Sequence, residues 1–400
     1  MTRVGITGIG VVAPGAIGID AFRAQLAGGR SAISEVDRFD SSAMSAHKAG
    51  VVRDFKAREF IPPMKLRRMN TLSRYAVAAA QLALRDAGLD PSALGDTGVA
   101  LGTSFGPVQT SVEYMQEYVE KGASLAPPQL FAESVANAPG SHIAIENDFR
   151  GFNVTITQRE SSALAAVMYA ASQIVKGTVS TAIVGGVEEL NEMIFSVLDH
   201  LGALAHANGT SGEDARPFDA RRNGLIFGEG SAVLVAQREA ARAYGYLAGF
   251  GIARDTTASL SNWGEDPGAV ATAMKAAIDD AELAPHEIDA VYASANSTRR
   301  ADRLEYLALQ ALFGERIPPV VATKGYFGEY AAGGGLQLVA ALVAVHDQVV
   351  HASAGYGSGD SDMRIEVTSK GRAAELRHVL VNSLSAGGGI VCAVISREAA

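Results

Sequence analysis

Residues 154–189 read VTITQRESSALAAVMYAASQIVKGTVSTAIVGGVEE and predict a strand, a sharp turn, a helix and a second strand. Val154–Thr157 are all β-branched, which favours an extended backbone. An alanine-rich helix is expected from about Ser161, and Lys176-Gly177 supplies a typical helix stop. The apolar run Ala182–Val184 then predicts a buried strand. This unit indicates an α/β protein in which most strands are buried.

Glu160 occupies the sharp turn before this helix. The N-terminus of a buried helix stabilises an anion, because its first N–H groups are free and the helix dipole is positive there. Such a turn therefore suits an activated nucleophile. The acid found here is either a replacement for that nucleophile or an ordinary first-turn carboxylate stabilised by the dipole.

Further motifs follow one another along nearly the whole chain. Residues 215–235, ARPFDARRNGLIFGEGSAVLV, are the most specific of them. The others are RVGITGIGVVAPG (3–15), MKLRRMNTLSRYAVAAAQLALRDAGLD (64–90), ASANSTRRADRLEYLALQALFG (293–314), TKGYFGEYAAGGG (323–335) and LVNSLSAGGGIVCAV (380–394). In this order they resemble the β-ketoacyl–acyl carrier protein synthases. The resemblance implies a thiolase-type α/β fold, with duplicated βαβ halves in a five-layer α-β-α-β-α arrangement.

In that family a catalytic Cys stands in the turn before the helix, and the next strand ends in GG-(A/V)-E. Counting back without gaps from Gly185-Gly186 places Glu160 on the Cys. The resemblance therefore implies that this chain keeps the fold of a condensing enzyme and lacks its nucleophile.

The other catalytic positions of the family are also altered. Ser294 stands at the first catalytic His, and Glu329 stands at the second, five residues after the retained Lys324. Ala386 replaces the gating Phe of the family's GFGG motif. Neither Ser294 nor Glu329 can act as an imidazole-like donor at neutral pH, so we expect no catalytic residues. Lys324 is expected to be a buried charge partner of Glu160 or Glu329, with Glu160 ionised beside it; the alternative is a solvated lysine.

Composition narrows the class of protein. The chain has 400 residues, 48% of them hydrophobic, which is enough to bury a large core. Its net charge of −9 argues against nucleic acid and anionic membranes as partners. The single cysteine, Cys392, lies in an apolar run typical of a buried strand and fits a reducing compartment. The longest apolar run, Leu338–Val345, is far shorter than the roughly 18 residues of a membrane span. We expect a cytoplasmic protein without a signal peptide.

No cofactor or metal is expected. Gly8–Ala13 fits the dinucleotide pattern G-x-G-x-x-A after a strand. In a nucleotide site, however, the helix begins on the glycine loop, and here Pro14-Gly15 would break it. A strand followed by a turn is therefore the better interpretation.

Strand-like and helical segments alternate in two series, which predicts two ketosynthase-like halves, 1–243 and 244–400. In the second half the pattern predicts, among others, a helix over Leu336–Val349 and a strand over Arg364–Val367. In the family, the region of Val154–Ile156 and of Ala163, Ala165 and Ala166 lines the two-fold interface.

A condensing-enzyme fold without its nucleophile resembles the chain length factors of type II polyketide synthases. The resemblance implies a heterodimer with a Cys-bearing ketosynthase, a shared acyl tunnel and an acyl carrier protein that brings the growing chain. Family members commonly carry Gln at the position of Glu160, so the acid is a departure. Two alternatives stay open, namely a malonyl–acyl carrier protein decarboxylase that supplies primers and a degenerate homodimeric scaffold.

We expect the helix after GTSFGP (102–107) to control the length of the acyl chain. Val108, Val112, Met115 and Val119 share one helical face, with Ser111 at its margin. In the family the equivalent helix closes the partner's tunnel; the alternative is core packing, which we favour for Val119. A basic run at Lys65, Arg67 and Arg68 is either a docking site for an acidic carrier protein or a solvated helix start.

Overall fold

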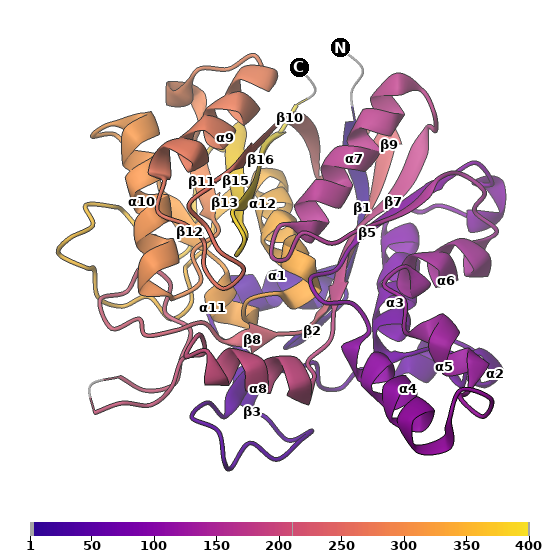
Figure 1. Cartoon of the computed structure of the whole chain (residues 1–400). Helices are drawn as coiled ribbons and strands as arrows, with labels where there is room; N and C mark the ends of the chain where they lie inside the picture. The colour runs from indigo at the N-terminus through magenta and orange to yellow at the C-terminus, as the bar shows by residue number, and fades with distance from the viewer. Residues whose placement is uncertain (1–3, 210, 399–400) are drawn as a thin grey trace.

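Two groups of five strands with the same order form the centre of the molecule (Figure 1). The computed structural model describes residues 4–209 and 211–398. The first group consists of β1 (Val4–Ala13), β5 (Gly98–Gly102), β6 (Asn153–Ile156), β7 (Thr181–Glu188) and β9 (Gly230–Arg238). The second consists of β10 (Gly245–Arg254), β11 (Ala290–Ala293), β12 (Val320–Ala322), β15 (His378–Leu384) and β16 (Gly389–Ser396).

Both groups also share one pattern of strand directions. β5 is parallel to β6 and β7, and β9 joins β7 to β1 through antiparallel pairs. β11 is likewise parallel to β12 and β15, and β16 joins β15 to β10 through antiparallel pairs. Antiparallel pairing of Gly5 with Tyr246 and of Ile6 with Gly245 connects the two groups into one sheet. The chain therefore builds the same plan twice.

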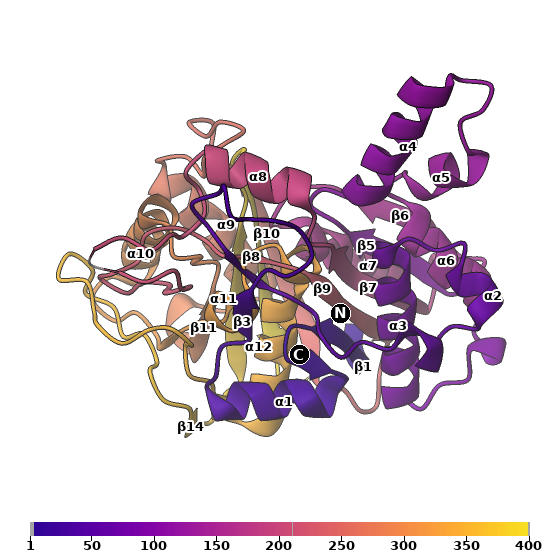
Figure 2. The same ribbon diagram turned by 90° about the horizontal axis from the view of Figure 1, so that it is seen from below.

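Helices form three layers around the two groups of strands (Figures 1 and 2). α3 (Thr71–Asp86) and α6 (Ala138–Asn147) pack on the outer face of the first group. α7 (Ser162–Lys176) and α12 (Gly335–Asp347) lie between the groups. α9 (Pro267–Asp280) covers the second group, with α10 (Arg299–Phe313) packed beside it. The five-layer α-β-α-β-α arrangement of the thiolase-type fold is confirmed.

The two central helices have apolar surfaces because each faces strands on both sides. Every residue of α12 from Gly335 to Val345 is buried, and α7 is alanine-rich where it meets the sheet. At Gly102 of β5, an added Cβ would clash with the backbone of Ser162, so only glycine allows α7 to pack this closely.

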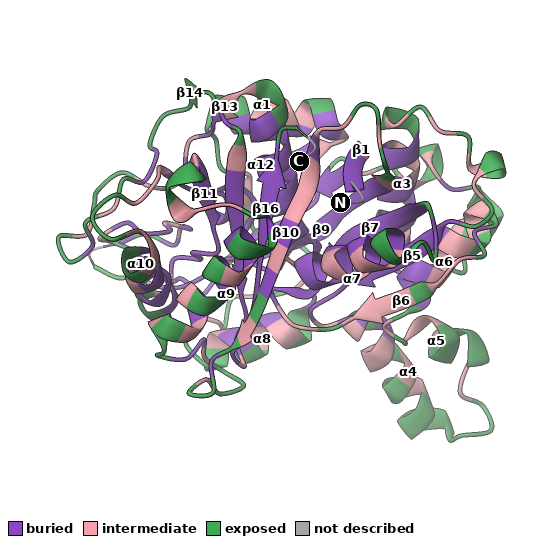
Figure 3. Ribbon diagram, turned by 90° about the horizontal axis from the view of Figure 1, so that it is seen from above, coloured by how far each residue is buried: buried purple, intermediate pink, exposed green. Residues whose placement is uncertain are grey.

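The remaining elements are short or lie outside the layers. They are α1 (Ile19–Gly28), α2 (Pro63–Leu66), α4 (Val108–Lys121), α5 (Pro128–Glu133), α8 (Glu192–His200), α11 (Lys324–Phe327), β2 (Ala16–Ile17), β3 (Ile33–Glu35), β4 (Lys48–Gly50), β8 (Phe227–Gly228), β13 (Val349–Val350), β14 (Arg372–Ala373) and the 3₁₀ turns η1 (Ala57–Glu59), η2 (Pro91–Ala93), η3 (Pro285–Glu287) and η4 (Ala331–Gly334). α4 and α5 project from the body, and most of their surface is exposed or half-buried (Figure 3).

Three expectations about local structure were wrong. Arg364–Val367 forms no strand, and only Val367 makes an isolated bridge, to Val320. The helix from residue 335 ends at Asp347, because Gln348 adopts a left-handed conformation and Val349 already belongs to β13. Ala163, Ala165 and Ala166 are buried in the core of their own chain rather than on its surface.

Two further expectations from the sequence concern the single cysteine and membrane-spanning helices. Cys392 is buried in β16, as expected. Within residues 4–209 and 211–398, no helix combines the length and the apolar character needed to cross a bilayer.

Candidate functional site

The positions that the sequence predicts to be altered meet where parallel strands of the two groups end. Glu160 lies between β6 and α7, whereas Ser294, Lys324 and Ala386 follow β11, β12 and β15. These last three strands are neighbours in the sheet, so their carboxyl ends lie side by side. In α/β sheets this edge is where functional side chains converge.

Glu160 sits in a strained turn directly before α7. Arg159 has a positive φ of 50°, which non-glycine residues rarely adopt. The backbone carbonyl of Glu160 accepts a hydrogen bond from Ser383 Oγ at 3.0 Å, which fixes the turn against the second half of the chain. Strain at a single residue in such a turn is typical of a functional elbow.

Glu160 is 1% exposed, and its side chain faces Ala386, the residue expected at the gate position. Its Oε2 accepts a hydrogen bond from the backbone N–H of Ala386 at 3.0 Å. Its Oε1 is buried and has no hydrogen-bond partner among the described residues. Burial, followed by the negative charge of Glu329, raises the pKa of Glu160 to about 7. The carboxyl is therefore partly protonated at neutral pH.

Lys324 binds Glu329 and not Glu160. Its Nζ lies 2.7 and 2.8 Å from the two carboxylate oxygens of Glu329, and both side chains are almost fully buried. The same Nζ donates to the backbone carbonyl of Ser294 at 2.6 Å. The expected ion pair between an ionised Glu160 and Lys324 was therefore wrong, because the only ammonium at this point of the described structure is already neutralised by Glu329.

Ser294 is held by its neighbours in the same way. Its Oγ accepts a hydrogen bond from the N–H of Leu384 at 2.9 Å, and its N–H donates to Glu305. Asp302 accepts hydrogen bonds from the N–H groups of Asn296 and Ser297. Glu305 and Asp302 thus shape the loop after β11 by binding its backbone.

Three aromatic side chains fill the space beside Glu160, and the sequence did not indicate them. Tyr330 packs against Phe105 and Phe227, with ring centroids 4.9 and 5.2 Å apart. The guanidinium of Arg159 lies over the ring of Phe105. Burial and the nearby Glu160 and Glu329 raise the pKa of Tyr330 well above its usual value of 10. The hydroxyl therefore stays protonated.

The residues expected to control length line an open groove on the projecting helix α4. The groove has a volume of about 530 Å³ and is lined by Val108, Ser111, Val112, Met115, Gln116, Val119, Glu120 and, from α8, Met193. Met115 and Val119 are 54% and 76% exposed, so the expectation of core packing for Val119 was wrong. The Oγ of Ser111 donates to the carbonyls of Pro107 and Ser134 and ties α4 to the end of α5.

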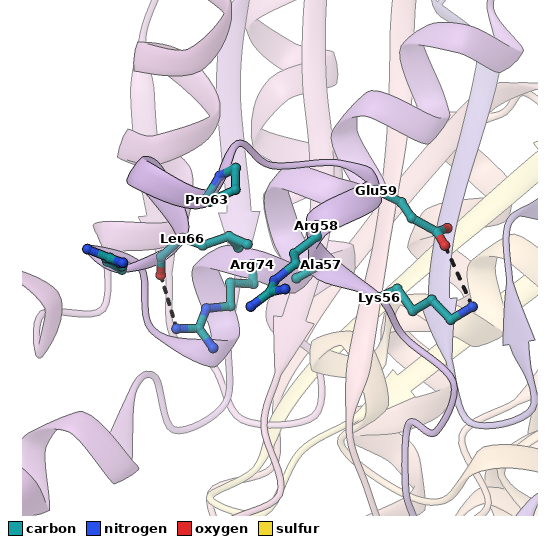
Figure 4. A pocket seen from close by; sticks show the side chains of 8 residues that line it. Lys56, Ala57, Arg58, Glu59, Pro63, Leu66 and Arg74 are labelled. Atoms are coloured by element: carbon teal, nitrogen blue, oxygen red, sulfur yellow. Dashed lines mark hydrogen bonds and ion pairs between the residues drawn. The ribbon is translucent and has the colours of Figure 1, made fainter.

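The basic run lies on and after α2, and all three side chains are exposed. Lys65 pairs with Glu146 at 2.6 Å. Arg67 borders a groove of about 670 Å³ that also contains Lys56, Arg58 and Arg74 (Figure 4). Arg68 lines a neighbouring cleft with Arg67 and Arg74. The groove beside Arg67 is therefore cationic, with Glu59 as its one acid, whereas the cleft beside Arg68 also contains Glu113, Glu133 and Glu189.

Comparison with models of protein families shows to which family the chain belongs. The model described as "Beta-ketoacyl synthase, N-terminal domain" matches residues 1–241, and "Beta-ketoacyl synthase, C-terminal domain" matches residues 244–356. The chain belongs to the β-ketoacyl synthase family.

Relatives within the β-ketoacyl synthase family include both subunit types of one system. The tetracenomycin polyketide synthase ketoacyl synthase beta subunit of Streptomyces glaucescens is 31% identical over 90% of each chain. The alpha subunit from the same organism is 30% identical, over 99% of this chain and 97% of its own. The structure of the ishigamide ketosynthase/chain length factor aligns with a TM-score of 0.90 and 26% identity over 99% of each chain.

The raised pKa of Glu160 predicts a pH-dependent stability. A carboxyl whose pKa is about 7 when folded and about 4.5 when unfolded stabilises the fold only in its protonated form, so its contribution is present below pH 4.5 and is lost between pH 4.5 and 7. Glu160→Gln keeps the shape and stays neutral. We expect its gain in free energy of unfolding to rise from near zero at pH 4.5 to about 3 kcal/mol at pH 8.

Chemical denaturation at several pH values measures this difference. Glu192→Gln is the control, because Glu192 is an exposed acid in the first turn of α8. An advantage of Glu160→Gln that does not change between pH 5 and pH 8 would contradict the argument.

Proposed function

We propose that this chain is the non-condensing chain length factor of a type II polyketide synthase, a cytoplasmic subunit that pairs with a Cys-bearing ketosynthase and shapes the acyl tunnel. One observation carries the proposal. A buried carboxyl stands at the elbow before α7, and the position opposite it holds a closed Lys324–Glu329 ion pair.

This arrangement is unsuited to condensation. A thiolate must accept the acyl chain, and donors must stabilise the negative charge that develops during decarboxylation of malonyl. Glu160 is a poor acyl acceptor, and Glu329 places negative charge where negative charge would develop. Tyr330 and Phe105 occupy space next to the elbow. The same features disfavour the decarboxylase alternative.

The edge of the sheet supports pairing with a second subunit. β6 ends the order of strands in the first group, and its residues are half-buried or exposed. An edge strand with free backbone groups is a site for pairing with another chain. The relatives named as alpha and beta ketoacyl synthase subunits and as a ketosynthase/chain length factor support a heterodimer. We expect an obligate interface that buries more than roughly 2,000 Å².

Co-expression with the cognate ketosynthase tests the proposal. We expect a one-to-one complex and, for this chain alone, no turnover of malonyl–carrier protein, because the thiol and both imidazoles are missing. The partner with its Cys changed to Ala is the control for activity in the complex. Turnover of malonyl–carrier protein by the isolated chain would favour the decarboxylase. A stable homodimer that does not bind the ketosynthase would favour the scaffold.

The groove on α4 is proposed as the length gauge. Val112 and Met115 lie on its apolar face, and Met193 of α8 extends that face. A bulky side chain at the end of a tunnel stops chain growth, whereas modest side chains leave room. The exposure of this face in the single chain is what a surface that meets a partner requires.

Val112→Phe or Met115→Trp should shorten the product by at least one two-carbon unit while the heterodimer persists. Mass spectrometry of the products from the reconstituted complex measures this. Glu117→Phe adds similar bulk on the face of α4 turned away from the groove, and it should leave the length unchanged. If Val112→Phe leaves the product length unchanged, the residues that control length lie elsewhere. If the variant no longer forms the heterodimer, the apolar face of α4 serves packing and not length control.

The cationic surface around α2 is proposed to bind the acidic acyl carrier protein. Arg67→Glu combined with Arg68→Glu should weaken carrier binding at least tenfold at low salt, and the loss should shrink as ionic strength rises. Titration by calorimetry or anisotropy measures the affinity. Lys176→Glu combined with Lys370→Glu reverses the same number of exposed cations away from α2 and should have little effect. Equal losses for both double variants would show that only net charge matters.

A further inference from the structure

The helix with the proposed gauge is buried only near its first turn, although it also contacts α5 and α8. Within α4 only Thr110 is buried. Beyond it the helix projects away from the sheets, with α5 beside it (Figures 2 and 3). The position of Val112 and Met115 therefore depends on how the base of the helix is held.

Glu188, the last residue of β7, holds the turn before this helix. Its Oε2 accepts hydrogen bonds from the N–H groups of Ser104 and Phe105 at 2.6 and 3.2 Å, and from Thr103 Oγ1 at 3.3 Å. Thr103 Oγ1 in turn accepts from the N–H of Gly106 at 3.0 Å. The whole turn from Thr103 to Gly106 is thus connected to one buried carboxyl.

Glu189 holds the helix itself. Its Oε1 accepts a hydrogen bond from the N–H of Gln109 at 3.0 Å, and the residue is only 3% exposed. The residue that precedes the helix, Pro107, makes no side-chain capping bond. An N-terminal N–H group needs such an acceptor. Glu189, the residue directly after β7, therefore supplies the cap that α4 lacks in its own sequence.

A small tilt at this base moves the gauge by a chemically relevant amount. Met115 lies six residues after Gln109, which is about 9 Å along the helix. A tilt of about 10° would displace it by about 1.5 Å, the length of one C–C bond. Loss of the cap would therefore make the position of the tunnel end less well defined, although the tunnel must distinguish chains that differ by two carbons.

Neighbouring groups leave Glu189 free for this role. Glu229, the acid whose charge acts most strongly on Glu189, is bound by Arg38 and by the N–H groups of Val52 and Leu190. Within residues 4–209 and 211–398, no group of three or more His, Cys, Asp or Glu side chains is placed to hold a metal ion. Burial, then the charges of Glu229 and Glu113, raises the pKa of Glu189 to about 7, so a neutral carboxyl serves as acceptor much of the time.

We propose that Glu189, supported by Glu188, is a positioning residue that fixes the tilt of α4 and thereby the sharpness of the length distribution. The proposal rests on the proposed function, because it takes α4 as the gauge. Its anchoring part concerns the fold alone and can be tested without any product.

The experiment compares four variants in the reconstituted complex with the cognate ketosynthase and carrier protein. Glu189→Ala removes the acceptor, and Glu189→Gln keeps an acceptor oxygen in the same place. Gln109→Pro removes the donor N–H and leaves Glu189 intact, in a first turn that tolerates proline. Glu192→Ala, an exposed acid on α8, is the control. Hydrogen exchange of residues 108–121 and the product-length distribution are measured for each.

We expect Glu189→Ala and Gln109→Pro to raise amide exchange in α4 about tenfold. The fraction of products that differ from the main length should at least double, while total malonyl consumption stays within twofold. Glu189→Gln and Glu192→Ala should behave as the unaltered chain. Normal behaviour of Glu189→Gln would separate a positioning role of Glu189 from a general loss of stability. If Glu189→Ala does not form the complex, Gln109→Pro tests the same hydrogen bond from the donor side.

Unchanged exchange in Glu189→Ala and Gln109→Pro would overturn the proposal. Faster exchange with an unchanged length distribution would also overturn it, provided that Val112→Phe shortens the product. If Val112→Phe has no effect, the gauge of the proposed function fails, and faster exchange still supports Glu189 as the anchor of α4.

Discussion

The buried Lys324–Glu329 ion pair is the interaction on which the rest of the site depends. One ammonium faces two buried carboxyl groups, and it is bound by both oxygens of Glu329 and by the carbonyl of Ser294. Burial and the negative charge of Glu329 raise the pKa of Glu160 to about 7, and Lys324, already neutralised by Glu329, does not pair with it. At the elbow before α7 the chain therefore carries a buried carboxyl close to Tyr330.

The sequence predicted which positions would meet, but it could not predict how they pair. Motif spacing brought Glu160, Ser294 and Ala386 to one place, because each follows a strand of the repeated fold. The partner of Lys324 was not predictable, since the choice between Glu160 and Glu329 depends on distances between separate loops. Phe105, Phe227 and Tyr330 come from three distant segments, and no periodicity links them.

The helix α4 illustrates a different limit. Its apolar periodicity correctly identified one face, with Val112 and Met115 on it. A period cannot say what covers such a face, and Val119 proved to be 76% exposed. The GG-(A/V)-E motif marked Glu188, but it did not indicate that Glu189 caps α4, because a capping carboxyl from a distant segment leaves no local pattern. The fold class followed from the motifs, whereas the roles of these side chains required coordinates.

The most direct test of the central claim is to find which subunit carries the acyl chain. The purified complex with its cognate ketosynthase would be incubated with acyl-loaded carrier protein, and the intact mass of both subunits would be measured. The account predicts an acyl adduct on the partner and none on this chain, since a buried Glu160 beside an ion-paired Lys324 offers no thiol. A stoichiometric acyl adduct on this chain would contradict it.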